Sequence, residues 1–440
     1  MDKQLTTNLM HGLTGQLQVP GDKSISHRGI MLGSLATGTT TLHNFLTSED
    51  CLSTLAAFRA MGVPIDRTGT DVTVHGVGLH GLKQPARALE MNNSGTTTRL
   101  IMGVLAGQSF TSELVGDQYL SKRPMRRVRD PLAKMGATIQ TTDGHLPARI
   151  TGQPLHGVET HMAVASAQVK SALILAGLQA HGTTIVHELL PTRDHTENML
   201  RAFGADLTVS PDKMTITVQP ATELHGQTVQ VPGDMSSAAF FMVAATLIPG
   251  SDITLTQVGL NPTRRGLLDI LQAMGGNVQV TAGESAGEPV GTIRVQSAPL
   301  HAINLAAADI PAVIDELPLV ALLASRADGV SRIEGAGELR VKETDRIACV
   351  ASELQKLGAD VQELPDGFVI TGRQSWQPQE TKLDSHGDHR IGMMLGLAAL
   401  LSPTPCTLAN AAAVAVSYPA FFDDLATLVG EEKKAEAAHD

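Results

Sequence analysis

Six glycines that follow expected helices place the strongest constraint on how this chain folds. They recur about every 70 residues, and each comes directly after a helix-like stretch that ends in an apolar residue. A glycine just past a helix end readily adopts the positive φ that stops the helix, a conformation that most other residues avoid. A period of this length is too long for a solenoid and predicts six α/β modules. The six positions are Gly62, Gly136, Gly204, Gly275, Gly358 and Gly430.

Alternating polar and apolar residues around a short polar turn follow the first five glycines, a pattern typical of β-hairpins. After Gly430 only a charged, alanine-rich tail remains (431–440), which we expect to be disordered. The sixth module therefore lacks its strands. We expect the N-terminus to supply them, since residues 4–7 and 16–19 look extended. The five expected hairpins span residues 63–74, 137–150, 205–218, 276–295 and 359–370.

A Val-Pro-Gly-Asp turn occurs twice, at residues 19–22 and 231–234, and an apolar helix-like run follows each copy. We interpret the two turns as crossings between two domains of three modules each. One predicted domain comprises residues 1–20 and 233–430, and the other comprises residues 21–232. A cleft between two such domains is the default place for a ligand.

Composition limits the classes of function. A net charge of −11 argues against general nucleic-acid binding, because a surface that follows phosphates needs excess positive charge. The apolar runs are too short to span a bilayer, and the N-terminus lacks the apolar core of a signal peptide. We therefore expect no membrane partner and a cytoplasmic protein. Three widely spaced cysteines favour a reducing compartment and match no metal or disulfide spacing; they are Cys51, Cys349 and Cys406.

The first turn continues into Lys23, Ser24 and Arg28, whereas its second copy has no Lys or Arg at the matching positions. The amide groups at a helix N-terminus, together with two added positive charges, favour an anion. The alternative interpretation is a capped helix with solvated bases. Three further segments place hydroxyl, amide or basic groups beside apolar helices, with ordinary helix caps or a solvated basic face as their alternatives. These segments are residues 92–99, 119–127 and 166–171.

Two acidic residues stand out as candidates for proton transfer. Asp315 lies in an apolar run, where an acid must be paired or have a raised pKa, although a helix cap explains it about equally well. Glu343 lies in residues 340–346, a segment of alternating charge that is usually a solvated helix face. Residues 384–390 match no strong metal motif, so we predict no metal site. Residues 76–81 match the glycine pattern of a dinucleotide-binding turn, but no helix opens there and we exclude that function.

These clusters together favour a pair of small anionic substrates rich in phosphate and carboxylate. The pattern indicates no nucleophilic Cys or Ser triad, so catalysis is expected to rest on positioning, electrostatics and proton transfer. The cations expected to converge on the ligands are Lys23, Arg28, Arg123, Lys342, Arg346 and Arg390.

Seven motifs, taken in order, resemble those of the 5-enolpyruvylshikimate-3-phosphate synthases (3-phosphoshikimate 1-carboxyvinyltransferases), and the likeness runs from Gly15 to Leu428. The resemblance implies transfer of the enolpyruvyl group of phosphoenolpyruvate to the 5-hydroxyl of shikimate 3-phosphate, with release of phosphate, in chorismate and aromatic amino-acid biosynthesis. It implies addition and elimination without a metal or another cofactor. It also implies two inside-out α/β barrel domains built from six βαβαββ units, and we expect a monomer. The motifs are Gly-Asp-Lys-Ser-Ile-Ser-His-Arg, Asn-Ser-Gly-Thr-Thr-Thr-Arg-Leu, Lys-Arg-Pro-Met, Ser-Ala-Gln-Val-Lys-Ser-Ala, Asp-Glu-Leu-Pro, Arg-Val-Lys-Glu-Thr-Asp-Arg and Asp-His-Arg-Ile.

The resemblance also implies roles for individual residues. Asp315 is expected to take the 5-hydroxyl proton, Glu343 to handle the proton at the phosphoenolpyruvate methylene carbon, and Lys23 to contact both substrates. The residues expected to bind shikimate 3-phosphate are Lys23, Ser24, Arg28, Ser166, Gln168, Arg193, Asp315 and Lys342. The residues expected to bind phosphoenolpyruvate are Lys23, Asn93, Gly95, Arg123, Gln168, Arg346 and Arg390.

Several positions depart from the pattern of one branch of this family. Ala167 and Val416 stand where that branch has Ser and Lys, which indicates the other, Gram-positive-type branch. Gly392 replaces a common Ala. Gly95 stands where an Ala crowds out the inhibitor glyphosate, so we predict that this chain leaves room for it.

Two alternatives remain open. The sister transferase acting on UDP-N-acetylglucosamine shares the fold, but it carries an early Lys-Asn pair and a catalytic Cys in a mobile loop. In this chain the pair is Lys23-Ser24, and the loop around residues 122–124 has no Cys. A non-catalytic anion-binding protein on the same fold is the second alternative, and retention of Asp315 and Glu343 argues against it.

Overall fold

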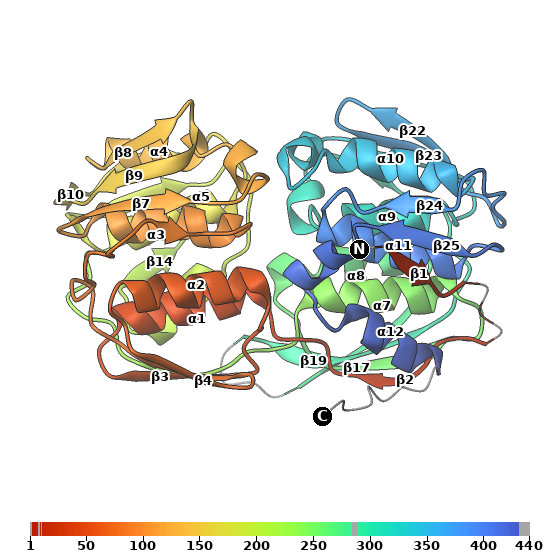
Figure 1. Cartoon of the computed structure of the whole chain (residues 1–440), viewed down its shortest axis with the longest axis horizontal. Coiled ribbons are helices and arrows are strands. Elements are labelled where there is room, and N and C mark those ends of the chain that lie inside the picture. Colours follow the sequence, from red (N-terminus) through yellow and green to blue (C-terminus); the bar gives the residue numbers. More distant parts are fainter. Residues whose placement is uncertain (1, 8, 10, 284–287, 431–440) are drawn as a thin grey trace. The chain divides into compact units, whose positions relative to one another are not determined.

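The computed structural model describes residues 2–7, 9, 11–283 and 288–430. By its internal contacts the chain forms two compact units (Figure 1). The continuous unit comprises Gly21–Pro232, and the discontinuous unit comprises the residues up to Pro20 and those from Gly233 onward. None of the helices in the described ranges combines the length and the apolarity that a membrane span requires. The tail that the sequence predicts to be disordered, 431–440, lies outside the described residues.

Three four-stranded sheets of one plan build the continuous unit. Their spatial orders are β16-β3-β5-β4, β6-β7-β9-β8 and β11-β13-β15-β14. In each sheet the first pair of strands is parallel, and the two following pairs are antiparallel. A short parallel pair, β10-β12, accompanies them. The strands are β3 (Thr39–His43), β4 (Ile65–Thr68), β5 (Asp71–His75), β6 (Leu89–Glu90), β7 (Thr111–Val115), β8 (Thr138–Thr142), β9 (His145–Thr151), β10 (Leu155–His156), β11 (Glu159–His161), β12 (Ala180–His181), β13 (Thr184–His187), β14 (Leu207–Val209), β15 (Thr215–Val218) and β16 (Thr228–Gln230).

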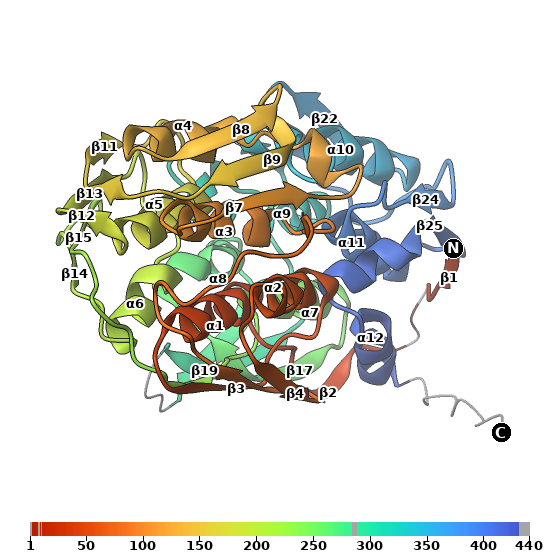
Figure 2. The same cartoon turned by 60° about the vertical axis from the view of Figure 1, so that its left-hand side comes forward.

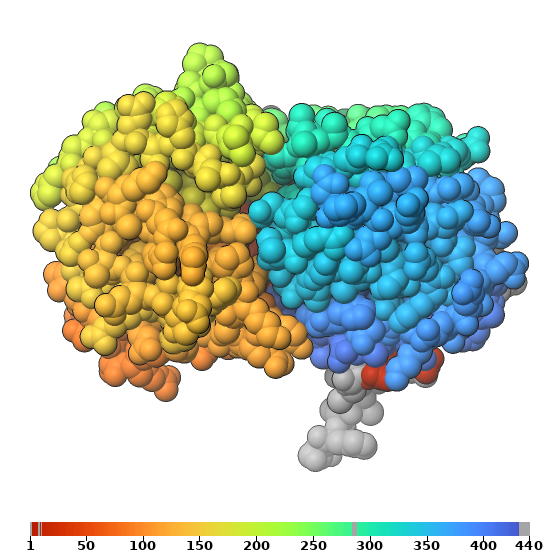
Figure 3. Space-filling view, turned by 90° about the horizontal axis from the view of Figure 1, so that it is seen from above, coloured from red at the N-terminus to blue at the C-terminus, as the bar shows by residue number. Residues whose placement is uncertain are grey.

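Three helices form the centre of this unit, namely α1 (Lys23–Leu35), α3 (Gly95–Ala106) and α5 (Ala167–Gly177). They are buried along almost their whole length, including charged side chains such as Arg28, Arg99 and Lys170. In both cartoon views α1 lies over β3 and β4, so the sheets cover the helices from outside (Figures 1 and 2). The part of the chain that includes β7 to β9, orange to yellow, dominates the face of this unit visible in Figure 3. The remaining helices are α2 (Glu49–Ala60), η1 (Leu120–Lys122), α4 (Arg126–Lys134) and α6 (His195–Ala202).

The discontinuous unit repeats this plan. Its four-stranded sheets have the orders β18-β19-β17-β2 and β20-β21-β23-β22, and its third sheet is β1-β25-β24. Its buried central helices are α7 (Met235–Leu247), α9 (Leu317–Ala324) and α11 (His389–Leu400). The other helices are η2 (Pro262–Arg264), α8 (Gly266–Ala273), η3 (Ile310–Ala312), η4 (Gly337–Val341), α10 (Arg346–Lys356), η5 (Ala411–Val416) and α12 (Phe421–Val429). The strands are β1 (Lys3–Leu5), β2 (Thr14–Leu17), β17 (Asp252–Gly259), β18 (Asn277–Ala282), β19 (Val290–Gln296), β20 (Asn304–Leu305), β21 (Val330–Ile333), β22 (Asp360–Leu364), β23 (Gly367–Thr371), β24 (Lys382–Asp384) and β25 (Cys406–Ala409).

The helix-ending glycines and the hairpins behave as the sequence predicts. All six glycines have positive φ, between 81° at Gly430 and 95° at Gly136. All five predicted hairpins form antiparallel pairs: β4–β5, β8–β9, β14–β15, β18–β19 and β22–β23. Residues 284–287, in the connection between β18 and β19, lie outside the described residues.

The prediction that both N-terminal strands complete the sixth module is wrong for one of them. β1 does pair antiparallel with β25 of the sixth module. β2 instead pairs parallel with β17 and becomes the first strand of the fourth module's sheet. The reason is the shared sheet plan, in which the edge strand pairs parallel with the strand that lies next to the hairpin. β16, which precedes the second Val-Pro-Gly-Asp turn, plays the same part beside β3.

Candidate active site

The first Val-Pro-Gly-Asp turn opens α1 in the continuous unit. A Cβ on Gly21 would lie 1.9 Å from the Asn44 carbonyl oxygen. Glycine is therefore needed here because another stretch of backbone passes so close, and not because the residue has a positive φ. The Asp22 carboxylate caps α1 by accepting from the Ile25 N–H at 2.9 Å. Lys23 then extends from the first turn of the helix to the Asp50 carboxylate, with its Nζ at 3.0 Å from Oδ2.

Arg28 is buried one turn further along α1, with only 4% of its surface exposed. Its guanidinium donates to the Thr196 hydroxyl at 2.6 Å, to the Ser171 hydroxyl at 2.9 Å and to the Ser24 carbonyl at 3.0 Å. α5 and α6 thus fix the orientation of this cation. The alternative interpretation of the sequence, a solvated base, does not describe it.

The start of α3 gathers a second group of site residues. Ser94 caps the helix, and a Cβ on Gly95 would lie 2.9 Å from the Arg123 Nη1 and 3.0 Å from the Arg99 Nη1. Arg123 is 7% exposed and donates to the Asn93 carbonyl at 3.4 Å. Only a residue without a side chain leaves both guanidinium groups where they lie.

Gln168, on the first turn of α5, connects this group to the third module. Its Oε1 accepts from Arg99 at 2.6 Å, and its Nε2 donates to the Thr96 hydroxyl at 3.0 Å. Ser166 directly precedes α5 and accepts from the Val169 N–H at 3.4 Å. The starts of α3 and α5 are thus connected by the hydrogen bonds of Gln168 to Arg99 and Thr96.

Arg193 lies in the segment before α6, and a buried ion cluster supports that segment. The Lys170 Nζ lies 2.9 Å from Glu188 and 2.7 Å from Glu197, and it donates to the Thr192 carbonyl at 3.3 Å. Burial raises the pKa of Glu188 despite the opposing charge of Lys170. Sequence reasoning missed this cluster, since a Lys inside an apolar helix gives no sign of its partners.

Asp315 stands at the centre of the discontinuous unit's site. Its Oδ1 lies 3.5 Å from the Lys342 Nζ and 3.7 Å from the Arg346 Nη1, and its Oδ2 lies 3.9 Å from the Arg390 Nη2. The carboxylate is 15% exposed, so a ligand hydroxyl has access to it. Three of the six predicted cations therefore gather around one predicted acid.

Arg346 does not fit the alternative interpretation of residues 340–346, a solvated helix face, because its side chain is 1% exposed. It contacts Glu343 at 2.6 Å and Asp388 at 2.7 Å. Burial opposes its charge, but Asp388, Glu343 and Asp315 outweigh burial and raise the pKa of Arg346. Burial likewise favours neutral Asp388, yet the Arg346 charge holds the pKa of this carboxyl below its usual value.

Arg390, at the start of α11, is positioned by Glu316. Its Nη1 lies 3.2 Å from the Glu316 Oε1 and donates to the Asp315 carbonyl at 2.9 Å. The same carboxylate oxygen accepts from the Ser236 hydroxyl, which in turn accepts from Arg264 at 2.7 Å. Glu316 is 3% exposed and gave no separate signal in the sequence.

Asp234 ties the second Val-Pro-Gly-Asp turn into this network. It accepts from the Ser236 N–H at 2.7 Å and lies 3.0 Å from the Arg264 Nη2. The start of α7 lacks the Lys and Arg of the first copy. The cation that contacts it is Arg264 of η2, and the anion that contacts it is Glu316.

Comparison with known proteins decides the family. A sequence model of EPSP synthase (3-phosphoshikimate 1-carboxyvinyltransferase) matches residues 8–425. The chain belongs to the EPSP synthase family. Its activity is that of an enolpyruvyl transferase of the shikimate pathway.

Relatives of this EPSP synthase family member support the predicted branch. The chain is 59% identical to the 3-phosphoshikimate 1-carboxyvinyltransferase of Lactiplantibacillus plantarum, over 97% of this chain and 99% of that protein. It is 48% identical to the enzyme of that name from Bacillus licheniformis, over 97% and 98%. These organisms agree with the predicted Gram-positive-type branch.

Solved structures agree on the fold. EPSP synthase from Acinetobacter baumannii superposes with a TM-score of 0.84 at 45% identity, covering 97% of this chain and 98% of that chain. The enolpyruvyl transferase NikO from Streptomyces tendae gives a TM-score of 0.76 at 21% identity, covering 97% of both chains, which shows a shared fold alone. The predicted enolpyruvyl transferase fold is confirmed.

Proposed function

We propose that this enzyme transfers the enolpyruvyl group of phosphoenolpyruvate to the 5-hydroxyl of shikimate 3-phosphate, with specific roles for individual side chains. The observation that supports these roles most is the cluster at Asp315, where Lys342, Arg346 and Arg390 lie within 3.9 Å of one carboxylate. A carboxylate held among cations is suited to receive a hydroxyl proton, while the cations bind the anionic groups of the substrates.

In the continuous unit, we assign the shikimate 3-phosphate contacts to Lys23, Ser24 and Arg28 on α1 and to two further segments. Ser166 and Gln168 belong to the start of α5, and Arg193 precedes α6. Helix N-termini and fixed cations together favour a phosphate group. In the discontinuous unit, Asp315 and Lys342 complete this set.

The phosphoenolpyruvate contacts follow the same logic. In the continuous unit we assign them to Lys23 and to the residues around Gly95, where the missing side chain leaves the backbone accessible. Arg346 and Arg390 supply positive charge from the discontinuous unit. The remaining assigned residues are Asn93, Arg123 and Gln168.

The proposed reaction has two steps. In the addition, Asp315 takes the proton of the 5-hydroxyl while the hydroxyl oxygen bonds to C2 of phosphoenolpyruvate. Glu343 gives a proton to the methylene carbon. In the elimination, Glu343, which lost its proton in the addition, takes a proton back from the resulting methyl group, the double bond reforms, and the bond from C2 to the phosphate oxygen breaks, so that phosphate leaves. Each general acid or base of this kind typically contributes about 10²–10⁴-fold in rate, and no cofactor enters either step.

The assay that tests the assignment is phosphate release from phosphoenolpyruvate and shikimate 3-phosphate, with Glu343→Gln beside the wild type. We expect kcat to fall by about 10²-fold or more, while calorimetry still detects both substrates, because Gln still accepts from Arg346. Glu334→Gln is the matched control, since Glu334 is an exposed residue that pairs with Arg332 on β21. Normal turnover by Glu343→Gln would contradict the role, and release only with UDP-N-acetylglucosamine as acceptor would favour the sister transferase.

We also propose that the enzyme is a cytoplasmic monomer and a target of glyphosate. The three cysteines are free thiols, which suits a reducing compartment. Light scattering after gel filtration measures the mass, and a dimeric mass would contradict the monomer.

A further inference from the structure

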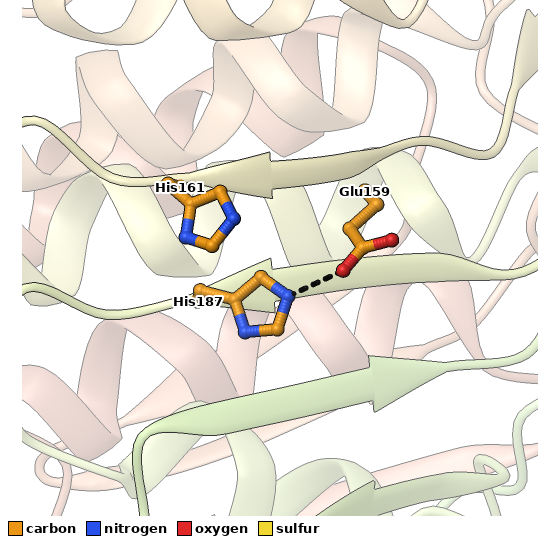
Figure 4. A group of neighbouring side chains, drawn as sticks. All are labelled: Glu159, His161 and His187. Carbon is orange, nitrogen blue, oxygen red and sulfur yellow. Dashed lines mark hydrogen bonds and ion pairs between the residues drawn. The ribbon is translucent and has the colours of Figure 1, made fainter.

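A group of three side chains with metal-binding chemistry lies on the third module of the continuous unit, and none of the three is assigned to a substrate. Glu159 and His161 are on β11, and His187 is on the neighbouring strand β13 (Figure 4). β11 and β13 are parallel, with His161 directly opposite His187. Glu159 is two residues before His161, so all three side chains leave the same face of the sheet.

The ligand atoms of the three residues already lie close together. The carboxylate oxygen and the two imidazole nitrogens are all within 4.8 Å of one another. In a tetrahedral zinc site with bonds of about 2.1 Å, two ligand atoms lie about 3.4 Å apart. Because Glu159 and His161 are exposed, small side-chain rotations suffice to bring the three atoms onto one ion. The His161 ring, now stacked on His187 at 4.3 Å, is the one that turns.

Hydrogen bonds prepare His187 for this role. Its Nε2 lies 2.8 Å from the Glu159 Oε1, and its Nδ1 lies 3.0 Å from the Thr215 hydroxyl on β15. The carboxylate accepts, so Nε2 carries the hydrogen and Nδ1 accepts from the hydroxyl. A metal ion bound at Nε2 displaces that hydrogen, and Nδ1 then carries the ring hydrogen. Nδ1 can donate it to the Thr215 oxygen, because a hydroxyl group can either donate or accept a hydrogen bond. Such an outer hydrogen bond fixes the ring and its tautomer in metal sites.

We propose that Glu159, His161 and His187 form a surface site for a divalent transition metal ion of the zinc class. Two imidazoles and one carboxylate are ligands that zinc accepts, with a water molecule in the fourth position. The site would join β11 to β13, the strands that lead toward Ser166 and Arg193. This proposal does not rest on the proposed function.

Zinc titration of the full-length, chelator-treated enzyme, followed by calorimetry, tests the site. We expect one saturable site in the wild type, and at least a 10-fold loss of affinity in His161→Gln and in His187→Gln. Thr215→Val removes only the outer hydrogen bond and should weaken binding by about 10-fold. Cobalt provides a second readout, because its visible absorption bands on binding to the wild type should disappear in His187→Gln.

His181→Gln is the matched control, since His181 is exposed on β12 of the same module and is not a member of the group. It should bind zinc as the wild type does. Equal zinc affinity in the wild type and His187→Gln would overturn the proposal, as would binding to the wild type that never saturates at one ion.

Discussion

His27 is a buried titratable residue within the helix that carries Lys23 and Arg28. Its Nδ1 lies 2.7 Å from the Thr54 hydroxyl, and hydroxyl contacts of the same length continue through Thr97 to Ser94. The chain of contacts joins α1, α2 and the cap of α3. Burial, with smaller contributions from Lys23 and Arg28, lowers the pKa of His27 to about 3, although Asp50 opposes the shift.

This shift predicts acid sensitivity. Below pH 6.5 the unfolded chain binds a proton at His27 that the folded chain does not, so protonation favours unfolding until the pH approaches 3. The free energy of unfolding should therefore fall by up to about 1.4 kcal/mol per pH unit over that window. His27→Asn keeps a polar group near Thr54 and does not titrate. Urea unfolding between pH 7 and 4.5 should give a shallower pH slope for the variant, and parallel slopes would contradict a role of His27 in the acid sensitivity.

Gly95 makes a second prediction at this scale. An Ala Cβ would lie within 3.1 Å of atoms of Arg123 and Arg99, so the Arg123 guanidinium must move. Gly95→Ala should therefore raise the glyphosate inhibition constant by about 10-fold or more, the effect of losing one charged hydrogen bond, and raise the KM for phosphoenolpyruvate. Gly337→Ala is a matched control, because its Cβ would meet only Asp366, at an ordinary 3.8 Å. If Gly95→Ala is inhibited as readily as the wild type, the prediction is wrong.

Site residues differ in how far the sequence predicts them. Lys23 and Asp315 stand out from their neighbours by charge, and the family's motifs name them. Their partners do not stand out: Asp50 is 27 positions from Lys23, and Asp388 is 42 positions from Arg346. Such pairs depend on which modules lie side by side, and local patterns carry no such information. The substrate roles of the site residues stay predictions.

At the scale of elements, helix starts organise both units. Asp22 and Asp234 both cap their helices, Asp22 by accepting from the Ile25 N–H of α1 and Asp234 by accepting from the Ser236 N–H of α7, but the two starts then diverge. α1 carries Lys23 and Arg28 in its own sequence. The start of α7 has no such residues, and its Ser236 instead contacts Arg264 of η2 and the Glu316 carboxylate. Since Glu316 also contacts Arg390, the second turn is linked to a predicted site residue.

Glu316→Gln tests this link. Gln still accepts from Ser236 but removes the charge that holds Arg390, and charged hydrogen bonds contribute about 1.5–3 kcal/mol. We expect the KM for phosphoenolpyruvate to rise by about 10-fold with a smaller change in kcat, because Arg390 is proposed to bind that substrate and to take no part in proton transfer. Steady-state kinetics separates the two constants, with Glu334→Gln as control. A fall in kcat alone would mean that Glu316 acts on the chemistry instead.

Elements were predicted well where one local rule decides them. A glycine after an apolar helix end requires positive φ, and all six comply. The hairpins follow from alternation and polar turns. The partner of β2 was missed, because an extended segment indicates a strand but not its sheet. β2 pairs in parallel with β17, a strand that lies more than 230 positions later in the sequence, and no local pattern indicates so distant a partner.

At the scale of the whole molecule, each unit closes on itself at the crossings. The Asp22 N–H donates to the Pro232 carbonyl at 2.7 Å, so the two ends of the continuous unit meet. The Asp234 N–H donates to the Pro20 carbonyl at 2.8 Å, which joins the two segments of the discontinuous unit. Each unit also has its own apolar core.

This closure predicts different fates for the separated pieces. Residues 21–232 contain every strand of their own sheets, so this fragment should fold alone and unfold cooperatively. Residues 233–440 lack β1 and β2, which leaves β25 paired only with β24 and β17 paired only with β19, each with one bare edge, and uncovers part of the core around Leu17. This fragment should therefore aggregate or unfold without a cooperative transition. Joining residues 1–20 to residue 233 through a short Gly-Ser link should restore cooperative unfolding, since Pro20 and Asp234 are already hydrogen-bonded neighbours. Circular dichroism and urea unfolding of the three chains measure this. Cooperative folding of 233–440 without the N-terminal strands would show that the core of α7, α9 and α11 alone is enough to hold the unit.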